Sequence, residues 1–307
     1  MREQDHEELG HQEEPFLAEI AMPNSHSHVF DASHVFNNPI ELSSYRLESD
    51  QIRIHDAVWG EAKIGDESGD EVFFALLDHP VIRRLQGIEQ LTLPKPMTTI
   101  AGTSEFSRWE HAWGSVILTR KLAAPLNLAP REQRVKEIRT FLSDSSHWAF
   151  SHLGDWIFQG SGGAEDEHDQ EQRAFLIKTG VAELLNEFGY SLDEILVLSE
   201  HEDWVEAKTP DLCVDRVDYG AREMLRWLTR SPELLGAINE FPFFVDGQGR
   251  LVITSEKAAV LFTKAFLLLS TEHWQEPSHR LQERLLEEMV KHAIAYHEPS
   301  FMQPIPW

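Results

Sequence analysis

Residues 141–155 read Phe-Leu-Ser-Asp-Ser-Ser-His-Trp-Ala-Phe-Ser-His-Leu-Gly-Asp, and no other stretch of the chain is so dense in chemically active side chains. Residues three apart share a face of a helix, so Asp144 would face the same way as His147. His152 and Asp155 would form a second such pair. If the run is mostly helical, both pairs can point into one cleft, and we expect the chain to be arranged around it.

Composition predicts one main domain behind an irregular tail. With 307 residues, 41% of them hydrophobic, and nine tryptophans, the chain can bury a large core. Residues 1–45 form an acidic segment rich in Glu, His, Asn and Ser without a sustained period, which predicts a largely irregular tail. Residues 46–307 are expected to form the folded domain, with a helical extension at its C-terminal end.

The formal net charge of −25 limits the partners of the protein. Duplex nucleic acid and anionic membranes both require a basic surface, so neither is expected as a partner. A small polyanionic substrate remains compatible if Arg and Lys side chains gather locally. No apolar run reaches the length of a membrane span and the first residues lack a signal-peptide core, so we expect a cytoplasmic location. Cys213, the single cysteine, is interpreted as a small buried residue.

The sequence pattern predicts a mostly α fold. Helices are expected at residues 71–77, 80–92, 109–123, 131–142, 168–188, 191–198, 211–228, 255–270 and 277–296. One β-hairpin is predicted, with strands at 243–245 and 251–253 flanking a Gly-containing turn. Residues 58–64 fit either a short strand pair or an extended lead-in.

The central stretch resembles the HD-motif helix of the HD-superfamily phosphohydrolases. That motif reads Leu-His-Asp-x-Gly-His-x-Pro-Phe-Ser-His, and residues 142–152 read Leu-Ser-Asp-Ser-Ser-His-Trp-Ala-Phe-Ser-His. Asp144, His147 and His152 are in register with the motif. Ser143 stands where the family has the histidine that gives the motif half its name.

Three further segments extend the resemblance to the dNTP triphosphohydrolase branch. Residues 84–91 resemble its Arg-Leu-x-x-Ile-x-Gln-Leu segment, residues 108–114 its Arg-Phe-Glu-His-Ser-Leu-Gly segment, and residues 215–219 its Asp-Lys/Arg-x-Asp-Tyr segment. The four segments occur in the family's order over roughly residues 50–225. The resemblance implies an HD-domain helical bundle that carries one small β-hairpin.

The resemblance implies a metal site formed by His111, Asp144 and Asp215. Such a set suits one divalent ion, namely Mn, Fe, Ni, Zn or Mg, and the loss of an imidazole at Ser143 should weaken its retention. An alternative is that His147 supplies the imidazole ligand that is missing at Ser143. Without the resemblance, His111 on an apolar helix face would be interpreted as a structural histidine.

The resemblance also implies the groups that move protons and bind substrate. His147 corresponds to the catalytic histidine, Asp155 to the carboxylate that orients it, and His168 to a further active-site histidine, although a solvated histidine is an equal alternative for His168. Imidazoles near neutral pKa suit proton transfer to a leaving oxygen. The expected substrate contacts are phosphate binding by Arg108, His152 and Arg216 and sugar binding by Gln90 and Tyr219.

Two functions follow from the resemblance. The first is a metal-dependent phosphohydrolase that acts on a nucleotide, such as a (deoxy)nucleoside triphosphate cleaved to nucleoside and triphosphate. The alternative is a catalytically degenerate HD domain that binds a nucleotide or a protein partner as a regulatory module. Ser143 favours the alternative, whereas the presence of Asp144, His147, Asp155 and Asp215 favours the enzyme. Because family members often assemble, a homo-oligomer is an open expectation.

Overall fold

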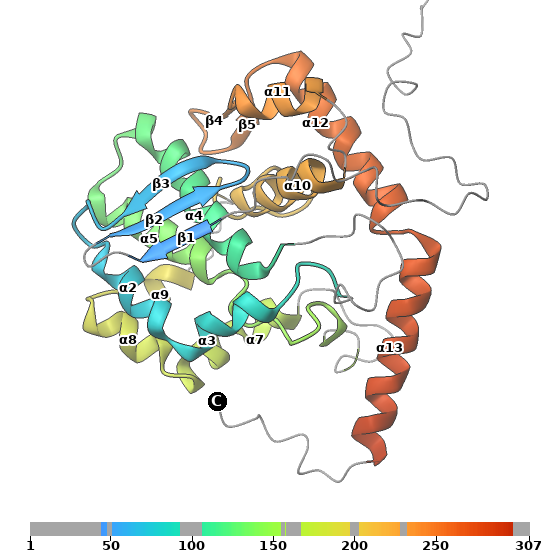
Figure 1. Cartoon of the computed structure of the whole chain (residues 1–307). Coiled ribbons are helices and arrows are strands. Elements are labelled where there is room, and N and C mark those ends of the chain that lie inside the picture. The colour runs from blue at the N-terminus through green and yellow to red at the C-terminus, as the bar shows by residue number, and fades with distance from the viewer. Residues whose placement is uncertain are drawn as a thin grey trace, which may run out of the picture.

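The computed structural model describes residues 44–47, 51–92, 106–154, 157, 167–196, 203–227 and 232–296. Within these ranges the protein is mostly helical, which confirms the predicted fold class (Figure 1). No helix in the described ranges is both long and apolar enough to cross a membrane. Nearly all of the predicted tail lies outside the described residues, so the division near residue 45 stays a prediction.

A central helix, α4 (Arg108–Ala123), positions the site. Ser107 caps it, with its Oγ accepting from the backbone N–H of Glu110 at 3.4 Å and its own N–H donating to the Glu110 carboxylate at 3.2 Å. Residues on every side of α4 are buried, as expected for a helix that neighbours surround. It packs against α5 (Pro130–Leu142) and α10 (Val214–Trp227).

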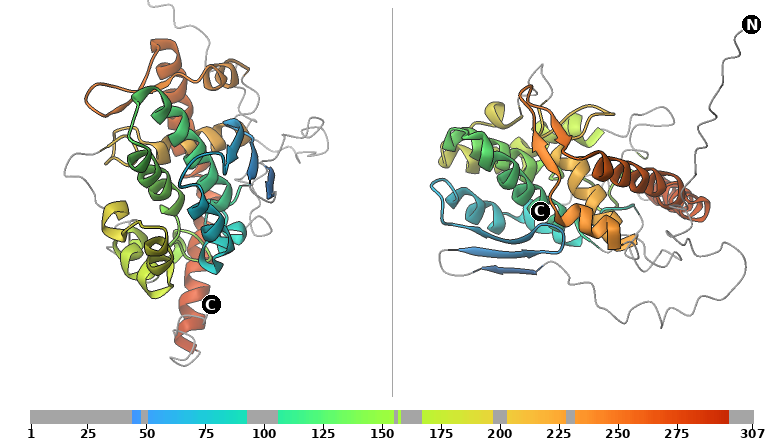
Figure 2. Two further views of the ribbon diagram at one scale, coloured as in Figure 1. Left: turned by 90° about the vertical axis from the view of Figure 1, so that its left-hand side faces the viewer. Right: turned by 90° about the horizontal axis from the view of Figure 1, so that it is seen from above.

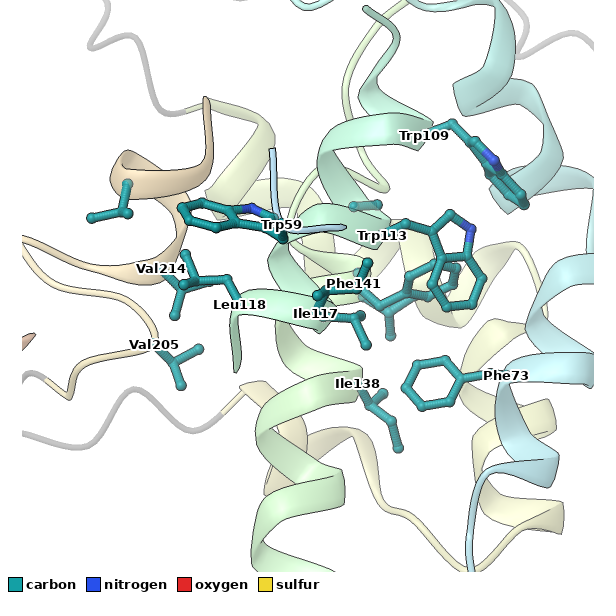
Figure 3. Packing of buried hydrophobic residues seen from close by; sticks show 14 of the residues in the cluster. Trp59, Phe73, Trp109, Trp113, Ile117, Leu118, Ile138, Phe141, Val205 and Val214 are labelled. Carbon is teal, nitrogen blue, oxygen red and sulfur yellow. The ribbon is translucent and has the colours of Figure 1, made fainter. Parts of the chain in front are cut away.

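Aromatic and aliphatic side chains pack together in the core beside α4 (Figure 3). The Trp113 and Phe141 ring centroids are 4.6 Å apart, and Phe73, from α2 (Glu71–Asp78), meets Phe141 edge-on at 5.5 Å. Phe141 opens the central stretch, and its full burial fixes the end of α5 against α4. The residues that follow Leu142, which include Asp144 and His147, therefore begin next to the central helix α4.

The chain also forms a three-stranded antiparallel sheet, β1 (Ser44–Leu47), β2 (Ile52–Asp56) and β3 (Gly60–Ile64). Residues 58–64 contain one strand, β3, which pairs with β2 instead of forming a strand pair of its own, and the sheet adds to the single hairpin that the sequence predicted. The expected hairpin is confirmed as β4 (Phe243–Val245) and β5 (Leu251–Ile253). In its turn, Gly249 has φ +77°, a conformation that favours glycine.

Two predicted helices are shorter than expected. The first is α3 (Pro80–Arg83), which continues as the 3₁₀ turn η2 (Arg84–Gly87) and then becomes extended. It ends because the Ile88 carbonyl accepts a hydrogen bond from the N–H of Arg108 at 2.8 Å. The predicted helix 168–188 is divided at Gly180, with φ +85°, into α7 (Glu167–Lys178) and α8 (Val181–Glu187).

The remaining helices complete the bundle. They are α9 (Leu192–Leu196), α11 (Pro232–Asn239), which the sequence analysis missed, α12 (Glu256–Leu268) and α13 (Pro277–Tyr296). A π-helical turn, η5 (Leu269–His273), follows α12 directly. Figures 1 and 2 show α13 along the edge of the molecule that lies opposite the three-stranded sheet.

Candidate active site

The structure brings the three predicted metal ligands together from three elements. His111 is on α4, Asp144 is in the turn after α5, and Asp215 is in the first turn of α10. The Nε2 atom of His111 lies 2.9 Å from Asp215 Oδ1 and 3.6 Å from Asp144 Oδ2. His111 and Asp144 are buried, whereas the Asp215 side chain is 38% exposed, so the cluster opens toward solvent on the side of α10.

A third carboxylate, Asp218, holds the His111 ring on its other side. Asp218 Oδ2 lies 2.7 Å from His111 Nδ1, and the indole N–H of Trp59 donates to Asp218 Oδ1 at 2.5 Å. Burial would raise the pKa of Asp218, but Arg222 and His111 outweigh it and lower that pKa. A carboxylate on the remote nitrogen is the usual support of a metal-binding histidine, because it leaves Nε2 directed at the metal.

Arg222 holds this support in place. Its Nε donates to Asp218 Oδ2 at 2.7 Å, and its Nη2 donates to Asp56 Oδ2 on β2, also at 2.7 Å. Gly114 on α4 makes room for it, since a Cβ there would lie 1.5 Å from Arg222 Nη2. Sequence reasoning missed Asp218 as a site residue, although its spacing to Asp215 and Arg222 on one helix is a readable signal.

The residues of this cluster fit a divalent cation. Asp144 Oδ2 is buried and has no hydrogen-bond partner among the described residues, and such an orphaned carboxylate oxygen calls for a cation. One imidazole nitrogen and two carboxylates suit a borderline or hard divalent ion. In the described part of the chain, no three His, Cys, Asp or Glu side chains already stand around one ion position. His111 Nε2 lies 2.9 Å from Asp215 Oδ1, so a cation bound by both residues would have to displace this direct contact.

The charges around His111 also favour a cation at this position. Burial would lower the pKa of its imidazole, but Asp144, Asp215 and Asp218 together raise it to about 10. Burial would raise the pKa of Asp144, yet Arg108, His111 and His147 hold it well below its usual range. Three carboxylates therefore surround one imidazolium, and the field at Nε2 favours positive charge.

The central stretch is not the helix that the sequence predicted. After α5 ends at Leu142, the chain makes turns, with an isolated bridge between Trp148 and Ser151 and a left-handed φ of +51° at Ser151. The helix stops because Gln172 on α7 donates to the Leu142 carbonyl at 2.7 Å. Ser143 Oγ donates to the Thr140 carbonyl at 2.9 Å. Ser143 thus turns its hydroxyl back toward α5.

This turn still brings together Asp144, the predicted metal ligand, and His147, the predicted catalytic histidine, which the helix was expected to place on one face. His147 Nε2 lies 3.2 Å from Asp144 Oδ1. The rings of His147 and His152 meet edge-on with centroids 4.9 Å apart. Arg84 fixes the turn from η2, because its guanidinium donates to the carbonyls of Ser145 and, at 2.6 Å, of His147. Sequence reasoning did not assign Arg84 to the site, although it begins one of the segments that resemble the family.

Arg108 links the cluster to the predicted substrate residues. Its Nη1 lies 2.7 Å from Asp144 Oδ1, and its Nη2 lies 3.3 Å from His152 Nε2 and donates to the Gln90 carbonyl at 3.2 Å. Burial, followed by the charge of Arg108, lowers the pKa of Arg84 to about 10, which leaves Arg84 charged at neutral pH. Two guanidinium groups therefore create local positive charge in an acidic chain.

The remaining predicted residues divide into Arg216, which makes other contacts, Tyr219, which lies beside the cluster, and two residues whose side chains are not described. Arg216 donates instead to the carbonyls of Ala207 at 2.7 Å and Asp211 at 2.6 Å, so the structure gives its guanidinium a role in the loop before α10. Tyr219 lies beside His111, with ring centroids 6.3 Å apart. Asp155 is outside the described residues, and only the backbone of His168, in the first turn of α7, is described.

Comparisons with known proteins support the resemblance. No family model matches the chain. A metal-dependent phosphohydrolase of Cordyceps militaris is 25% identical over 244 residues, covering 78% of this chain and 65% of that protein. The uncharacterised protein YdhJ of Bacillus subtilis is 29% identical over 223 residues, covering 70% of this chain and 60% of that protein. The chain thus spans less than two thirds of the length of either relative.

Two solved structures share the fold. A hypothetical protein from Aquifex aeolicus superposes with a TM-score of 0.60 at 21% identity, over 80% of this chain and 66% of that one. A phosphohydrolase from Bacteroides thetaiotaomicron superposes with a TM-score of 0.59 at 19% identity, over 79% of this chain and 59% of that one. These two comparisons establish the architecture of the chain, and its chemistry is argued from the site.

Proposed function

We propose that the protein is an HD-type, metal-dependent phosphohydrolase that acts on a nucleotide. The observation that carries this proposal is the convergence of Asp144, Asp215 and His111, with one buried Asp144 oxygen that has no hydrogen-bond partner in the described part of the chain. The similarity to a relative named as a metal-dependent phosphohydrolase supports the same reaction class.

In this proposal, His111, Asp144 and Asp215 hold one divalent ion. When bound, such an ion polarises a phosphoryl oxygen and lowers the pKa of a bound water. Asp218 keeps the His111 ring oriented for this task through its 2.7 Å contact with Nδ1. The identity of the ion among Mn, Fe, Ni, Zn and Mg is left to experiment.

The arginines supply the phosphate contacts. Guanidinium groups bind phosphate oxygens through paired, charge-assisted hydrogen bonds. Arg108 reaches both Asp144 and His152, so a phosphate bound there would lie beside the proposed ion and the catalytic loop. Arg84 adds a second positive charge while holding the backbone of His147. Gln90 and Tyr219 are retained as candidate contacts for the sugar.

His147 is the proposed proton donor. In the cleavage of a (deoxy)nucleoside triphosphate to nucleoside and triphosphate, a water oxygen bonds to the α-phosphorus while the bond from phosphorus to the 5′ oxygen breaks. That oxygen needs a proton, and an imidazole held by Asp144 at 3.2 Å is placed to deliver it. Asp155 as the orienting carboxylate and His168 as a second proton-transfer group complete the proposal.

Two specific observations favour a second function. Ser143 contributes no imidazole and bonds to its own helix, while Arg108 is already paired with Asp144 at 2.7 Å. Both features fit a regulatory domain that binds a nucleotide or a protein partner without cleaving a substrate. The lack of duplex nucleic-acid or membrane partners remains a prediction from charge, and a cytoplasmic location remains a prediction from the sequence.

A nucleotide screen tests the proposal. The full chain is incubated with deoxy- and ribonucleotides and with each candidate metal, and products are separated by chromatography. We expect release of nucleoside and triphosphate, with turnover lost and nucleotide binding kept in His147→Ala. His292→Ala, on α13, is the matched control and should behave like the wild type. Binding without product under every metal would replace the enzyme with the regulatory module.

A further inference from the structure

Helix α13 buries glutamates and exposes large apolar side chains, which is the reverse of an ordinary surface helix. Its Glu283 and Glu287 residues are only 5% and 3% exposed. Its Leu281, Leu285 and Met289 residues are 60%, 55% and 64% exposed. A helix of a self-contained domain buries its apolar stripe and exposes its charges, so the apolar side of α13 is built to be covered by something else.

The buried side of α13 packs against the rest of the chain. Leu286 packs against Leu153, with Val290 of the same helix beside them. Glu283 receives a hydrogen bond from Arg280 at 2.9 Å, and Glu287 one from Arg284 at 2.5 Å. These two arginine–glutamate pairs lie within the helix, and Leu286 and Val290 determine which side of α13 faces the rest of the chain.

The exposed apolar residues form one continuous ridge. Leu281, Leu285 and Met289 are spaced four apart, so they lie in a single row along the helix, about 12 Å long at 1.5 Å per residue. Rows of this spacing on two helices interdigitate in the commonest mode of helix packing in globular proteins. We call these three residues the α13 ridge. Its shape fits another helix that carries the same row.

The charges on α13 indicate which partner covers the α13 ridge. Helix α13 carries three basic residues (Arg280, Arg284, Lys291) and three acidic residues (Glu283, Glu287, Glu288), which cancel, whereas the whole chain has a net charge of −25. Two copies of so acidic a chain repel one another over most of their surfaces, and α13 is a place where that repulsion is absent. Beside the ridge, Arg284 and Glu288 form an ion pair within the helix at 3.5 Å, and their side chains are 64% and 60% exposed.

We propose that the α13 ridge is a self-association surface on which a second copy of the chain packs its own α13 about a two-fold axis. A two-fold contact requires a surface that is complementary to itself, and a ridge bordered by one basic and one acidic residue meets that requirement, because Arg284 of each copy can face Glu288 of the other. This surface would give the homo-oligomer expected from the sequence a defined location.

Pairing through α13 also reaches the candidate site. Leu153, against which Leu286 packs, follows His152 directly and is fully buried. A second copy that immobilises α13 therefore supports the end of the loop that carries His147 and His152. This inference stands independently of the proposed catalytic activity, because it rests on the exposure pattern and the charges of α13.

Sedimentation velocity of the full chain tests the surface. The wild type should sediment as two chains at micromolar concentration, and Leu285→Glu should sediment as one, with the dissociation constant raised by about a hundredfold or more because two carboxylates would be buried face to face. Ile177→Glu is the matched control, since Ile177 is 50% exposed on a different helix and should leave the two-chain species intact. A two-chain species that persists in Leu285→Glu overturns the proposal, as does a wild type that sediments as a single chain.

A cross-link provides a second readout that does not depend on affinity. The only native cysteine, Cys213, is 1% exposed, so Leu285→Cys introduces a single accessible thiol. Two-fold pairing places the two introduced thiols near the axis, and mild oxidation should then yield a covalent two-chain product. Ile177→Cys should yield none. An uncross-linked Leu285→Cys under conditions in which the chain sediments as two copies would place the interface elsewhere and refute the α13 ridge.

Discussion

Asp218 Oδ2 lies 2.7 Å from His111 Nδ1, and both side chains are completely buried. The contact commits one ring nitrogen of His111 to the protein and directs the other toward Asp144 and Asp215. A metal-binding histidine is typically supported in this way: one carboxylate, here Asp218, holds one ring nitrogen, and the other nitrogen faces the metal position. In this protein that second nitrogen faces Asp144 and Asp215.

Asp218→Asn should weaken metal binding without removing a ligand. The neutral amide holds the His111 ring less firmly, and supporting residues of this kind contribute about 10–100-fold to metal affinity. Competition titration of Mn²⁺ against a chelating dye measures the change. Asp246→Asn, in the distant hairpin turn, should titrate like the wild type. Equal affinity in Asp218→Asn and the wild type would mean that the 2.7 Å contact does not support a ligand.

Gly114→Ala should destabilise the fold behind the site. The new Cβ would lie 1.5 Å from Arg222 Nη2 and 2.3 Å from Asp218 Oδ1, so the buried ion pair must move, at a cost of about 1–3 kcal/mol. Gly236→Ala on α11 is the control, because a Cβ there meets nothing within 4 Å and alanine is the better helix former. Urea unfolding should show the first variant less stable and the second unchanged or more stable. A neutral Gly114→Ala would contradict the tight packing of Arg222.

The metal-free protein should lose stability as the pH rises above neutral. The pKa of His111 is raised to about 10 in the folded chain, against burial, by its three carboxylate neighbours, and its ordinary value is 6.5. The folded state therefore holds a proton that the unfolded state releases, so this contribution is complete below pH 6.5 and is lost as the pH rises through about 10. Unfolding free energies of chelator-treated protein at pH 7 and pH 9.5 test the sign. His111→Gln should remove this part of the slope, and an unchanged slope would contradict the assignment.

Ser143→His should raise metal affinity by at least about tenfold, or about 1.4 kcal/mol. An imidazole next to Asp144 restores the nitrogen ligand that the family resemblance implies, whereas the native hydroxyl is bonded to Thr140 at 2.9 Å. Ser143→Ala loses the same hydroxyl without adding a ligand and serves as the control. If Ser143→His and Ser143→Ala bind metal equally, residue 143 does not face the pocket. Higher hydrolysis in Ser143→His would indicate a drifted enzyme, and unchanged hydrolysis an adapted three-ligand site.

The features that the sequence predicted correctly are those that depend on local sequence patterns. Helix α13 has the expected bounds of 277–296, and the hairpin strands have the expected residues, because apolar periodicity and Gly-containing turns are local signals. The grouping of His111, Asp144 and Asp215 came from the family resemblance, because their spacing in the sequence says nothing about their distance in space.

Features that depend on distant partners could not be predicted in this way. The end of α5 is set by Gln172, which lies 30 residues beyond the carbonyl of Leu142 that it caps. The orientation of Arg216 follows from carbonyl groups that a loop presents to it. The role of Asp218 depends on His111, 107 residues earlier in the chain. Each of these is a tertiary contact that overrides a reasonable local interpretation.

Metal titration of the wild type and Asp215→Ala is the most direct test of the central claim that His111, Asp144 and Asp215 form a metal centre. Asp211→Ala, which removes an exposed carboxylate just before the same helix, is the matched control. The wild type and Asp211→Ala should each bind one Mn²⁺ per chain in calorimetry and elemental analysis, and Asp215→Ala should bind it at least about tenfold more weakly. Equal metal content and affinity in all three proteins would show that Asp215 is no ligand and would contradict the account.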